Sequence, residues 1–335
     1  MIPEKLQNEA KTIIDLINKS NRLLIISHLR PDGDAIGSVS GLMQSLEKLG
    51  KKVDVDLLDG VPARFPFTWP EGHEMLKQAE IKSDHDLILV LDCGDNERHG
   101  VKIEYDKSKT TLVNIDHHAS NTMYGDLNYV DTGAQATCEI ITALIDKAGW
   151  PLDANMAETI MLGLMTDSRT FSNEGIRYTT YEAAACLQRT GFSNARLLDI
   201  LNCSRNETDV RLQGYGLTRF KLECNGKLAT LVLTQKELKD LNANVGNIFG
   251  SGLFNIPLTI GSVHASAVIF EREDGMSACE FRSRGGINVK EVAVALGGGG
   301  HAPASGCSQA IPITEMADKA IDLMKKQVDA FYSNK

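Results

Sequence analysis

The sequence predicts an α/β protein of two domains: a first domain built on a parallel sheet, and a second, smaller α/β domain. Three observations predict this class. In the first half, short apolar runs alternate with helical patterns, as parallel sheets require. From about residue 205 the pattern changes to strands that bracket helices. The 335 residues also exceed the roughly 100–200 residues of one typical domain.

The elements of the first domain follow from hydrophobic periodicity. Strands are predicted at 23–26, 52–58, 87–91 and 110–115. Helices are predicted at 4–19, 35–50, 134–149, 153–165 and 180–190. The second helix ends at Gly50, which suits a C-terminal cap. Strands separated by helices in this order favour a parallel sheet.

The second domain is expected to mix strands and helices in a different order. Its strands are predicted at 227–234, 264–273 and 276–284, and its helices at 235–241, 288–296 and 313–331. We therefore expect a first domain over 1–190, a connection over 191–210 and a second domain over 211–335.

Composition limits the classes of partner. The chain is 42% hydrophobic and 24% charged, with a net charge of −9 and no lysine- or arginine-rich block. Proteins that bind long duplex nucleic acid usually show a basic footprint, so that partner is not expected. A short nucleic acid, a substrate of another kind or a metal that supplies positive charge remains compatible with this charge.

Cysteine use and hydropathy predict a cytoplasmic protein. The seven cysteines are scattered without CxxC spacing, as is typical of reduced thiols. The N-terminal residues form a charged amphipathic pattern and lack the apolar core of a signal peptide. No run approaches the ~18 apolar residues of a membrane span, so no membrane partner is expected.

Acids and imidazoles follow three predicted strands and one helix. The first group lies in the stretch "RLLIISHLRPDGDAIGS" at 22–38. In chain order the residues are His28, Asp32, Asp34, Asp92, Asp116, His117, His118 and Asp167. Ligands of open α/β sheets bind outside the carboxyl ends of the strands. One such acid alone is more often a turn or N-cap residue.

The combination of these residues favours a divalent metal site. Carboxylates mixed with imidazoles suit ions such as Mn²⁺, and one carboxylate can bridge two ions. Two ions about 3.5–4 Å apart clamp the oxygens of a phosphoryl displacement. A structural zinc site would require four closed ligands, usually with cysteine, which this pattern lacks.

A glycine run in the second domain carries a separate signal. Glycines at 297–300 permit close backbone approach and can present N–H groups to an anion. Arg282 and Arg284 precede the run, and an arginine fork matches a phosphate. The alternative is that the glycines cap a helix and the arginines lie on a solvated strand.

The motifs in order resemble those of a known family. "HLRPDGDAIGS", "LDCGD", "DHH" and "GLMTDSRTF" are similar to the four motifs of the DHH phosphoesterases. "EFRSRGGINVKEVAVALGGGGHAPASG" at 280–306 resembles the DHH-associated C-terminal domain. The length and the layout are most similar to the nanoRNase/pAp phosphatase (NrnA-like) branch. The resemblance spans nearly the whole chain.

The resemblance implies a role for each site residue. The metal ligands would be His28, Asp32, Asp34, Asp92, His117 and Asp167, with Asp92 as a bridge between two Mn²⁺ ions; Mg²⁺ or Co²⁺ could substitute. The catalytic residues would be His118, facing the substrate phosphate, and Asp116, orienting His117 or the loop. The substrate-binding residues would be Arg282, Ser283, Arg284, Gly298, Gly299, Gly300 and His301.

The resemblance also implies the activity. It predicts a Mn²⁺-dependent phosphoesterase that hydrolyses short oligoribonucleotides from one end and 3′-phosphoadenosine 5′-phosphate (pAp). Alternatives are a phosphodiesterase for pApA and other products of cyclic dinucleotides, or an exopolyphosphatase or pyrophosphatase. A nucleotide-binding relative without turnover is a further alternative, although such relatives should lose a ligand. A homodimer is compatible with the family.

Overall fold

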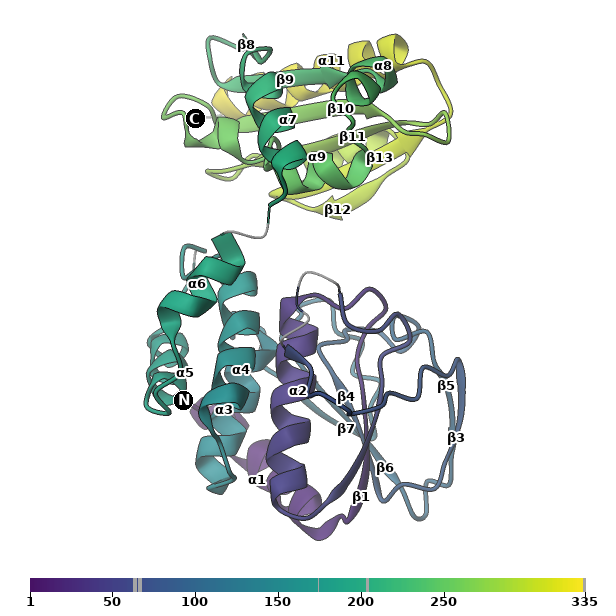
Figure 1. Ribbon diagram of the computed structural model, residues 1–335, viewed down its shortest axis with the longest axis vertical. Helices are drawn as coiled ribbons and strands as arrows, with labels where there is room; N and C mark the ends of the chain where they lie inside the picture. The colour runs from purple at the N-terminus through teal and green to yellow at the C-terminus, as the bar shows by residue number, and fades with distance from the viewer. Residues whose placement is uncertain (63–64, 66–67, 174, 203–204, 334–335) are drawn as a thin grey trace. The chain divides into compact units, whose positions relative to one another are not determined.

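The computed structural model describes residues 1–62, 65, 68–173, 175–202 and 205–333. The chain divides into two compact units, Met1–Leu201 and Asn202–Lys335 (Figure 1). Each unit contains its own sheet with packed helices, and the first sheet is parallel. The predicted fold class is therefore confirmed. The segment 191–210, expected as a connection, contains α6 (Asn194–Asn202) and the start of α7 (Glu207–Leu217).

The sheet of the N-terminal unit has five parallel strands in the order β2-β1-β4-β6-β7. Their bounds are β1 Arg22–Ile26, β2 Lys52–Asp56, β4 Leu87–Leu91, β6 Thr111–Asp116 and β7 Leu127–Val130. The central strand β4 reads "LILVL" and is buried throughout, as both faces of a parallel sheet are covered. The edge strand β7 was not predicted, because its four residues are mostly half-buried and show no apolar run.

Helices cover one face of this sheet. They are α1 Gln7–Lys19, α2 Gly33–Lys48, α3 Thr137–Ala148, α4 Ala154–Asp167 and α5 Tyr178–Gln188, with the 3₁₀ turn η1 Glu4–Leu6 before α1. Apolar side chains of β1, β4 and the helices form one large core. The opposite face packs in a smaller core with the two-stranded sheet of β3 (Glu80–Ser83) and β5 (Lys102–Tyr105).

Helices α2 and α4 lie side by side because glycines line their contact (Figure 1). A Cβ atom at Gly37 would lie 2.8 Å from the carbonyl oxygen of Thr159, and one at Gly163 would lie 2.8 Å from the carbonyl oxygen of Gly33. Only glycine allows such close backbone approach. The contact brings the end of α4 beside the start of α2, where predicted site residues lie.

The C-terminal unit has a six-stranded mixed sheet in the order β12-β13-β11-β10-β9-β8. Its strands are β8 Lys221–Glu223, β9 Leu228–Leu233, β10 Ala265–Glu271, β11 Ser277–Ser283, β12 Gly299–His301 and β13 Ala304–Gln309. Its helices are α7, α8 Gln235–Asp240, α9 Val245–Ser251, α10 Lys290–Ala295 and α11 Ile313–Ser333, with the 3₁₀ turn η3 Ile256–Thr259.

Two cores sandwich this sheet. Phe281 and the apolar stripe of α11 pack on one face with α10, and Val268 and Phe270 pack on the other with α7, α8 and α9. Figure 1 shows α7, α8 and α9 on one side of the sheet and α11 on the other. Alternate residues of each strand thus serve opposite faces. In the described ranges of both units, no helix has the length and apolar character needed to cross a bilayer.

Candidate metal centre

Three neighbouring strands deliver the predicted acids and imidazoles to one edge of the N-terminal sheet. Strands β1, β4 and β6 are adjacent and parallel, so their carboxyl ends meet at that edge. Chain order along the sheet reverses between β1 and β4, which is the switch point where ligands of such sheets bind. The polar residues predicted from the strand ends therefore converge.

The segment after β1 contributes three side chains. His28 is buried, and its Nδ1 lies 2.7 Å from the carbonyl oxygen of Leu29, which leaves Nε2 for the site. Asp32 caps α2 and accepts N–H groups of that helix with Oδ1. Asp34, in the first turn, is fully buried. The turn that follows the strand thus serves both as a helix start and as part of the site.

Asp92 lies at the centre of the cluster. It follows β4 directly, is 1% exposed, and has a φ of 54°. A left-handed backbone is uncommon outside glycine and costs about 1–2 kcal/mol, although aspartate tolerates it better than most residues. Its Oδ2 lies 3.5 Å from His28 Nε2 and its Oδ1 lies 3.5 Å from His117 Nε2. The two oxygens thus face the two predicted metal-binding histidines.

His117 has a buried nitrogen without a hydrogen bond. Its Nδ1 lies 3.4 Å from the carbonyl oxygen of Ala134, whereas Nε2 has no partner at hydrogen-bond distance. Nε2 lies 3.5 Å from Asp167 Oδ2 and 3.8 Å from Asp34 Oδ2. Buried polar atoms are normally satisfied, and a bound ion is one explanation for an exception.

The candidate ligands form three overlapping groups whose donor atoms lie within 4.8 Å of one another. The groups are His28, Asp32 and Asp92; Asp34, His117 and Asp167; and Asp92, His117 and His118. Together, the first two groups contain the six residues that the family resemblance implies as metal ligands. Asp92 occurs in two of the three groups, consistent with a central position.

The acids of the cluster repel one another. Burial raises the pKa of Asp92 well above its usual value, and the charges of Asp34, Asp32 and Asp167 raise it further. Burial and the neighbouring acids likewise raise the pKa of Asp167 to about 9. Burial also raises the pKa of Asp34. A protein that keeps these carboxylates together needs either protons or cations between them.

Asp116 pairs with His118. The family resemblance had instead implied that Asp116 orients His117 or the loop. Asp116 Oδ1 lies 2.7 Å from His118 Nδ1, and Oδ2 accepts a hydrogen bond from Asn121. Burial acts to raise the pKa of Asp116, but these hydrogen bonds outweigh it and lower the pKa. The same pairing raises the pKa of His118. His118 thus leaves Nε2 free and favours the protonated ring.

Two predicted substrate residues share one face of the C-terminal sheet. Arg282 of β11 is directly opposite Ala304 of β13, and Ala304 is directly opposite His301 of β12. The three residues form one cross-strand row, so the side chains point to the same face. Arg282 Nη1 is 2.8 Å from Glu280 Oε2 on that face, and His301 is exposed.

The structure places other predicted substrate residues differently. Ser283 is buried on the opposite face and donates to the carbonyl of Ile287. The Arg284 guanidinium donates to three backbone carbonyls, those of Ile260, Gly261 and Val263. Both side chains therefore tie loops of the unit together. The Ser283 hydroxyl is therefore turned away from Arg282, and two of the three guanidinium nitrogens of Arg284 are bonded to the backbone.

The first half of the glycine run follows the alternative interpretation, in which the glycines cap a helix. Gly297 has a φ of 74°, and the N–H groups of Gly297 and Gly298 donate to Val294 and Ala293 in a Schellman cap of α10. Gly299 and Gly300 belong to the edge strand β12. A Cβ at Gly298 would strike β13. The run thus caps a helix and starts a strand, which leaves the Gly298 N–H unable to bind an anion.

Comparison with known proteins decides the family. Residues 22–164 match the DHH family, N-terminal domain, and residues 234–330 match the DHHA1 domain. A protein of Thermus thermophilus named bifunctional oligoribonuclease and PAP phosphatase NrnA is 30% identical over 308 residues, which cover 91% of this chain and 90% of the relative. The chain belongs to the DHH family.

A second relative and one solved structure are similar to nearly the whole chain. A Bacillus subtilis protein of the same name is 27% identical, with coverage of 88% of this chain and 92% of that protein. An exopolyphosphatase-related protein from Bacteroides fragilis has the same fold, with a TM-score of 0.83, 24% identity, and coverage of 97% and 96%. The predicted resemblance to DHH phosphoesterases is confirmed. The chain is accordingly an enzyme of the phosphoester-hydrolysing class.

In the DHH domain, the start of α3 contributes donors to the site that the sequence motifs did not reveal. The N–H groups of Thr137 and Cys138 donate to the two oxygens of Asp34 at 2.6 and 2.8 Å, and the Thr137 hydroxyl lies 3.2 Å from Asp92 Oδ1. A helix N-terminus favours a carboxylate. Backbone donors leave no side-chain signature in a sequence, although the predicted helix at 134–149 marked the place.

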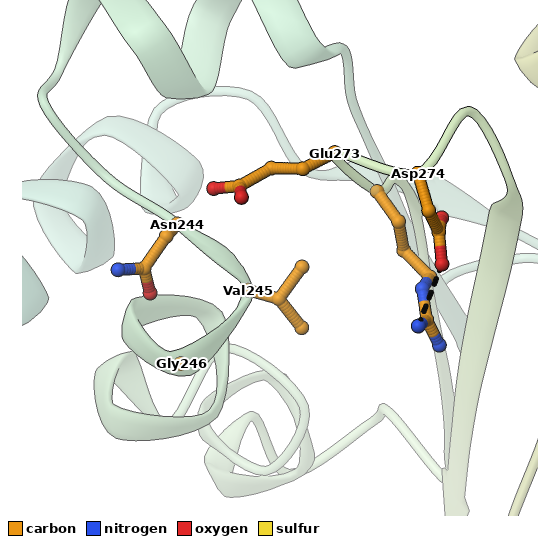
Figure 2. A pocket seen from close by; sticks show the side chains of 6 residues that line it. Asn244, Val245, Gly246, Glu273 and Asp274 are labelled. Carbon is orange, nitrogen blue, oxygen red and sulfur yellow. Dashed lines mark ion pairs between the residues drawn. The ribbon is translucent and has the colours of Figure 1, made fainter.

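The DHHA1-containing unit also contains a cavity that lies apart from the predicted substrate residues. It measures about 460 Å³ and lies between the start of α9 and the turn that joins β10 to β11 (Figure 2). Its lining consists of Asn244, Val245, Gly246, Arg272, Glu273 and Asp274. Arg272 is neutralised by Asp274 at 2.8 Å. No predicted site residue is among the lining residues.

Proposed function

We propose that this DHH protein is a metal-dependent phosphoesterase that hydrolyses short oligoribonucleotides and pAp. The observation that carries the proposal is the convergence of two imidazoles and four carboxylates at the carboxyl edge of β1, β4 and β6. The names of the Thermus and Bacillus relatives, which join an oligoribonuclease to a PAP phosphatase, support the choice of substrates.

The cluster fits divalent cations. His117 Nε2 is buried and unsatisfied, with carboxylate oxygens of three acids between 3.5 and 3.8 Å away. The mixed donor set favours Mn²⁺, with Mg²⁺ or Co²⁺ as substitutes. We assign one ion to His28, Asp32 and Asp92, and a second to Asp34, Asp92, His117 and Asp167.

Backbone carbonyls set the tautomer of both proposed histidine ligands in the same way. Carbonyl oxygens face Nδ1 of His28 and Nδ1 of His117, which favours the tautomer with a free Nε2. Asp92 lies between the two rings and offers one oxygen to each side. When bound, a pair of ions in such a site activates water and neutralises charge on the phosphoryl group.

His118 acts on the substrate and not on the metals. Asp116 holds its Nδ1 and favours the imidazolium, so a proton is available at Nε2. We assign to His118 the proton transfer to the leaving oxygen, and its positive charge also stabilises the transition state. General acid catalysis of this kind typically contributes about 10²–10⁴-fold.

The face that carries Arg282 and His301 binds the nucleotide. One guanidinium and one imidazole in the same cross-strand row suit a phosphate group. Only a few phosphates can be matched by so few cations. The net charge of −9 also favours short substrates, because a negatively charged protein repels a long polyanion.

A substrate panel with Mn²⁺ tests the proposal. We expect hydrolysis of pAp and of RNA of about two to five nucleotides, and slower hydrolysis of RNA of about 20 nucleotides. Parallel reactions with the Asp92→Asn variant control for contaminating nucleases. Preference for pApA or for pyrophosphate would replace the substrate assignment. No hydrolysis of any of these compounds would contradict the proposed function.

A further inference from the structure

Arg177 lies outside the candidate metal ligands, at the N-terminal cap of α5. Its Nη2 lies 2.7 Å from Asp131 Oδ2 and 3.4 Å from Glu139 Oε1. Asp131 and Glu139 are each 2% exposed. Buried carboxylates are unfavourable unless they are paired. Arg177 is the cation that pairs with both.

Glu139 extends this network to neighbouring elements. Its carboxylate accepts hydrogen bonds from the hydroxyls of Thr179 and Thr180 at 2.7 and 2.8 Å, and from the N–H of Gln135 at 3.0 Å. The start of α5 is thus joined to the loop after β7 and to the first turn of α3. We call residues 131–138, which span this loop and the first helical residues, the clamped segment.

The clamped segment contacts three of the proposed metal ligands. Its last two N–H groups donate to Asp34 at 2.6 and 2.8 Å, and the Thr137 hydroxyl lies 3.2 Å from Asp92. The Ala134 carbonyl faces His117 Nδ1. One short segment therefore orients ligands assigned to both ions.

We propose that Arg177 is a positioning residue of the metal centre. By pairing with Asp131 and Glu139, it fixes the clamped segment, and this segment fixes Asp34, Asp92 and His117. The inference rests on the proposed function, because it requires the cluster to bind metal. Groups that orient metal ligands from outside typically change metal affinity by about 10- to 100-fold when they are substituted.

The test measures Mn²⁺ affinity on the full chain, from the electron paramagnetic resonance signal of free Mn²⁺. Arg177→Gln should weaken binding by about 10- to 100-fold. Arg177→Lys keeps the charge but loses the planar fork, so its loss should be smaller. The affinities are compared on folded variants, so a graded loss in this order reports on the positioning of the ligands and not on loss of the fold.

Two further variants separate positioning from stability. A Cβ at Gly133 would lie 3.0 Å from Arg177 Cζ, so Gly133→Ala should displace the guanidinium and weaken Mn²⁺ binding with Arg177 still present. Arg22 at the start of β1 also pairs with two acids, Asp54 and Asp84. Arg22→Lys is the matched control and should leave the affinity unchanged.

The outcomes distinguish the positioning role of Arg177 from the proposed function of the metal centre. Affinities within twofold of wild type in folded Arg177→Lys and Gly133→Ala would overturn the positioning role, and so would an equal loss in Arg22→Lys. These two variants retain a cation at position 177, so they carry the test if Arg177→Gln fails to fold. A wild-type chain that binds no Mn²⁺ would contradict the proposed function itself.

Discussion

The two units hold their candidate functional groups in opposite ways. In the N-terminal unit, Asp34 and Asp92 are 0% and 1% exposed. Backbone N–H groups of α3 donate to both oxygens of Asp34, and the Thr137 hydroxyl lies 3.2 Å from Asp92 Oδ1. In the C-terminal unit, Arg282 and His301 lie on a sheet face, with His301 exposed. The first arrangement suits an ion held in fixed geometry. The second suits a ligand that binds and leaves.

The comparison also concerns stability. The buried acids of the N-terminal unit raise one another's pKa values, so they oppose folding of the metal-free chain. Sites that are built for function often cost stability in this way. The C-terminal row balances Arg282 with Glu280 and carries no comparable cluster. Removing a buried acid of the N-terminal unit should therefore not destabilise the metal-free chain, but it should abolish metal binding. Removing a cation of the C-terminal row should instead weaken substrate binding.

The largest effect is expected for Asp92→Asn. Because this carboxylate is shared between both proposed ions, metal binding should be lost and turnover should fall by about 10³-fold or more. The metal-free variant should unfold at the same or a higher temperature, because one repelling charge is removed. Metal content, pAp hydrolysis and thermal unfolding measure the three outcomes. Asp95→Asn, in the same loop, is the control; normal turnover in Asp92→Asn would refute the assignment.

Next in size is the contrast between adjacent histidines. His117→Ala should lose bound metal, because Nε2 faces three of the acids. His118→Ala should keep the metal and lose about 10²–10⁴-fold in turnover, as expected for a general acid. Mn²⁺ stoichiometry and kcat are measured for both variants. Equal metal content in the two variants would show that the proposed division of roles is wrong.

A smaller effect is expected in the C-terminal unit. Arg282→Ala and His301→Ala should each raise KM for pAp by about 10- to 100-fold, since a charge-assisted contact contributes roughly 1.5–3 kcal/mol. Metal content and the hydrolysis of bis-p-nitrophenyl phosphate, which lacks the nucleotide, should change little. Arg272→Ala, an exposed ion-pair partner in the same unit, serves as the control. Equal damage to both substrates would place these residues in the catalytic centre.

Hydrophobic runs and strand-end chemistry made much of this architecture predictable. Strands β1, β4 and β6 are apolar and buried, and each is followed by acids or imidazoles in the sequence. The small elements escaped prediction because β3, β5 and β7 are only four residues long and most of their residues are exposed or half-buried. Helix α6 and the start of α7 lie where a connection was expected.

What the sequence could not show were contacts made by the backbone and by distant charges. The N–H groups that hold Asp34 belong to α3, more than 100 positions away. Arg177 reaches Asp131 and Glu139 across 46 and 38 positions. Ser283 illustrates a different limit, because strand alternation turns it away from Arg282 and into the core. Motif membership alone does not reveal that direction.

The most direct test of the account is an anomalous difference map from crystals grown with Mn²⁺, collected at the manganese edge. We predict two peaks at the edge of the N-terminal sheet, one ligated by His28, Asp32 and Asp92, and one by Asp34, Asp92, His117 and Asp167. Asp92 should contact both peaks, and His118 Nε2 neither. A single peak, an Asp92 bound to only one ion, or no peak at this edge would contradict the central claim.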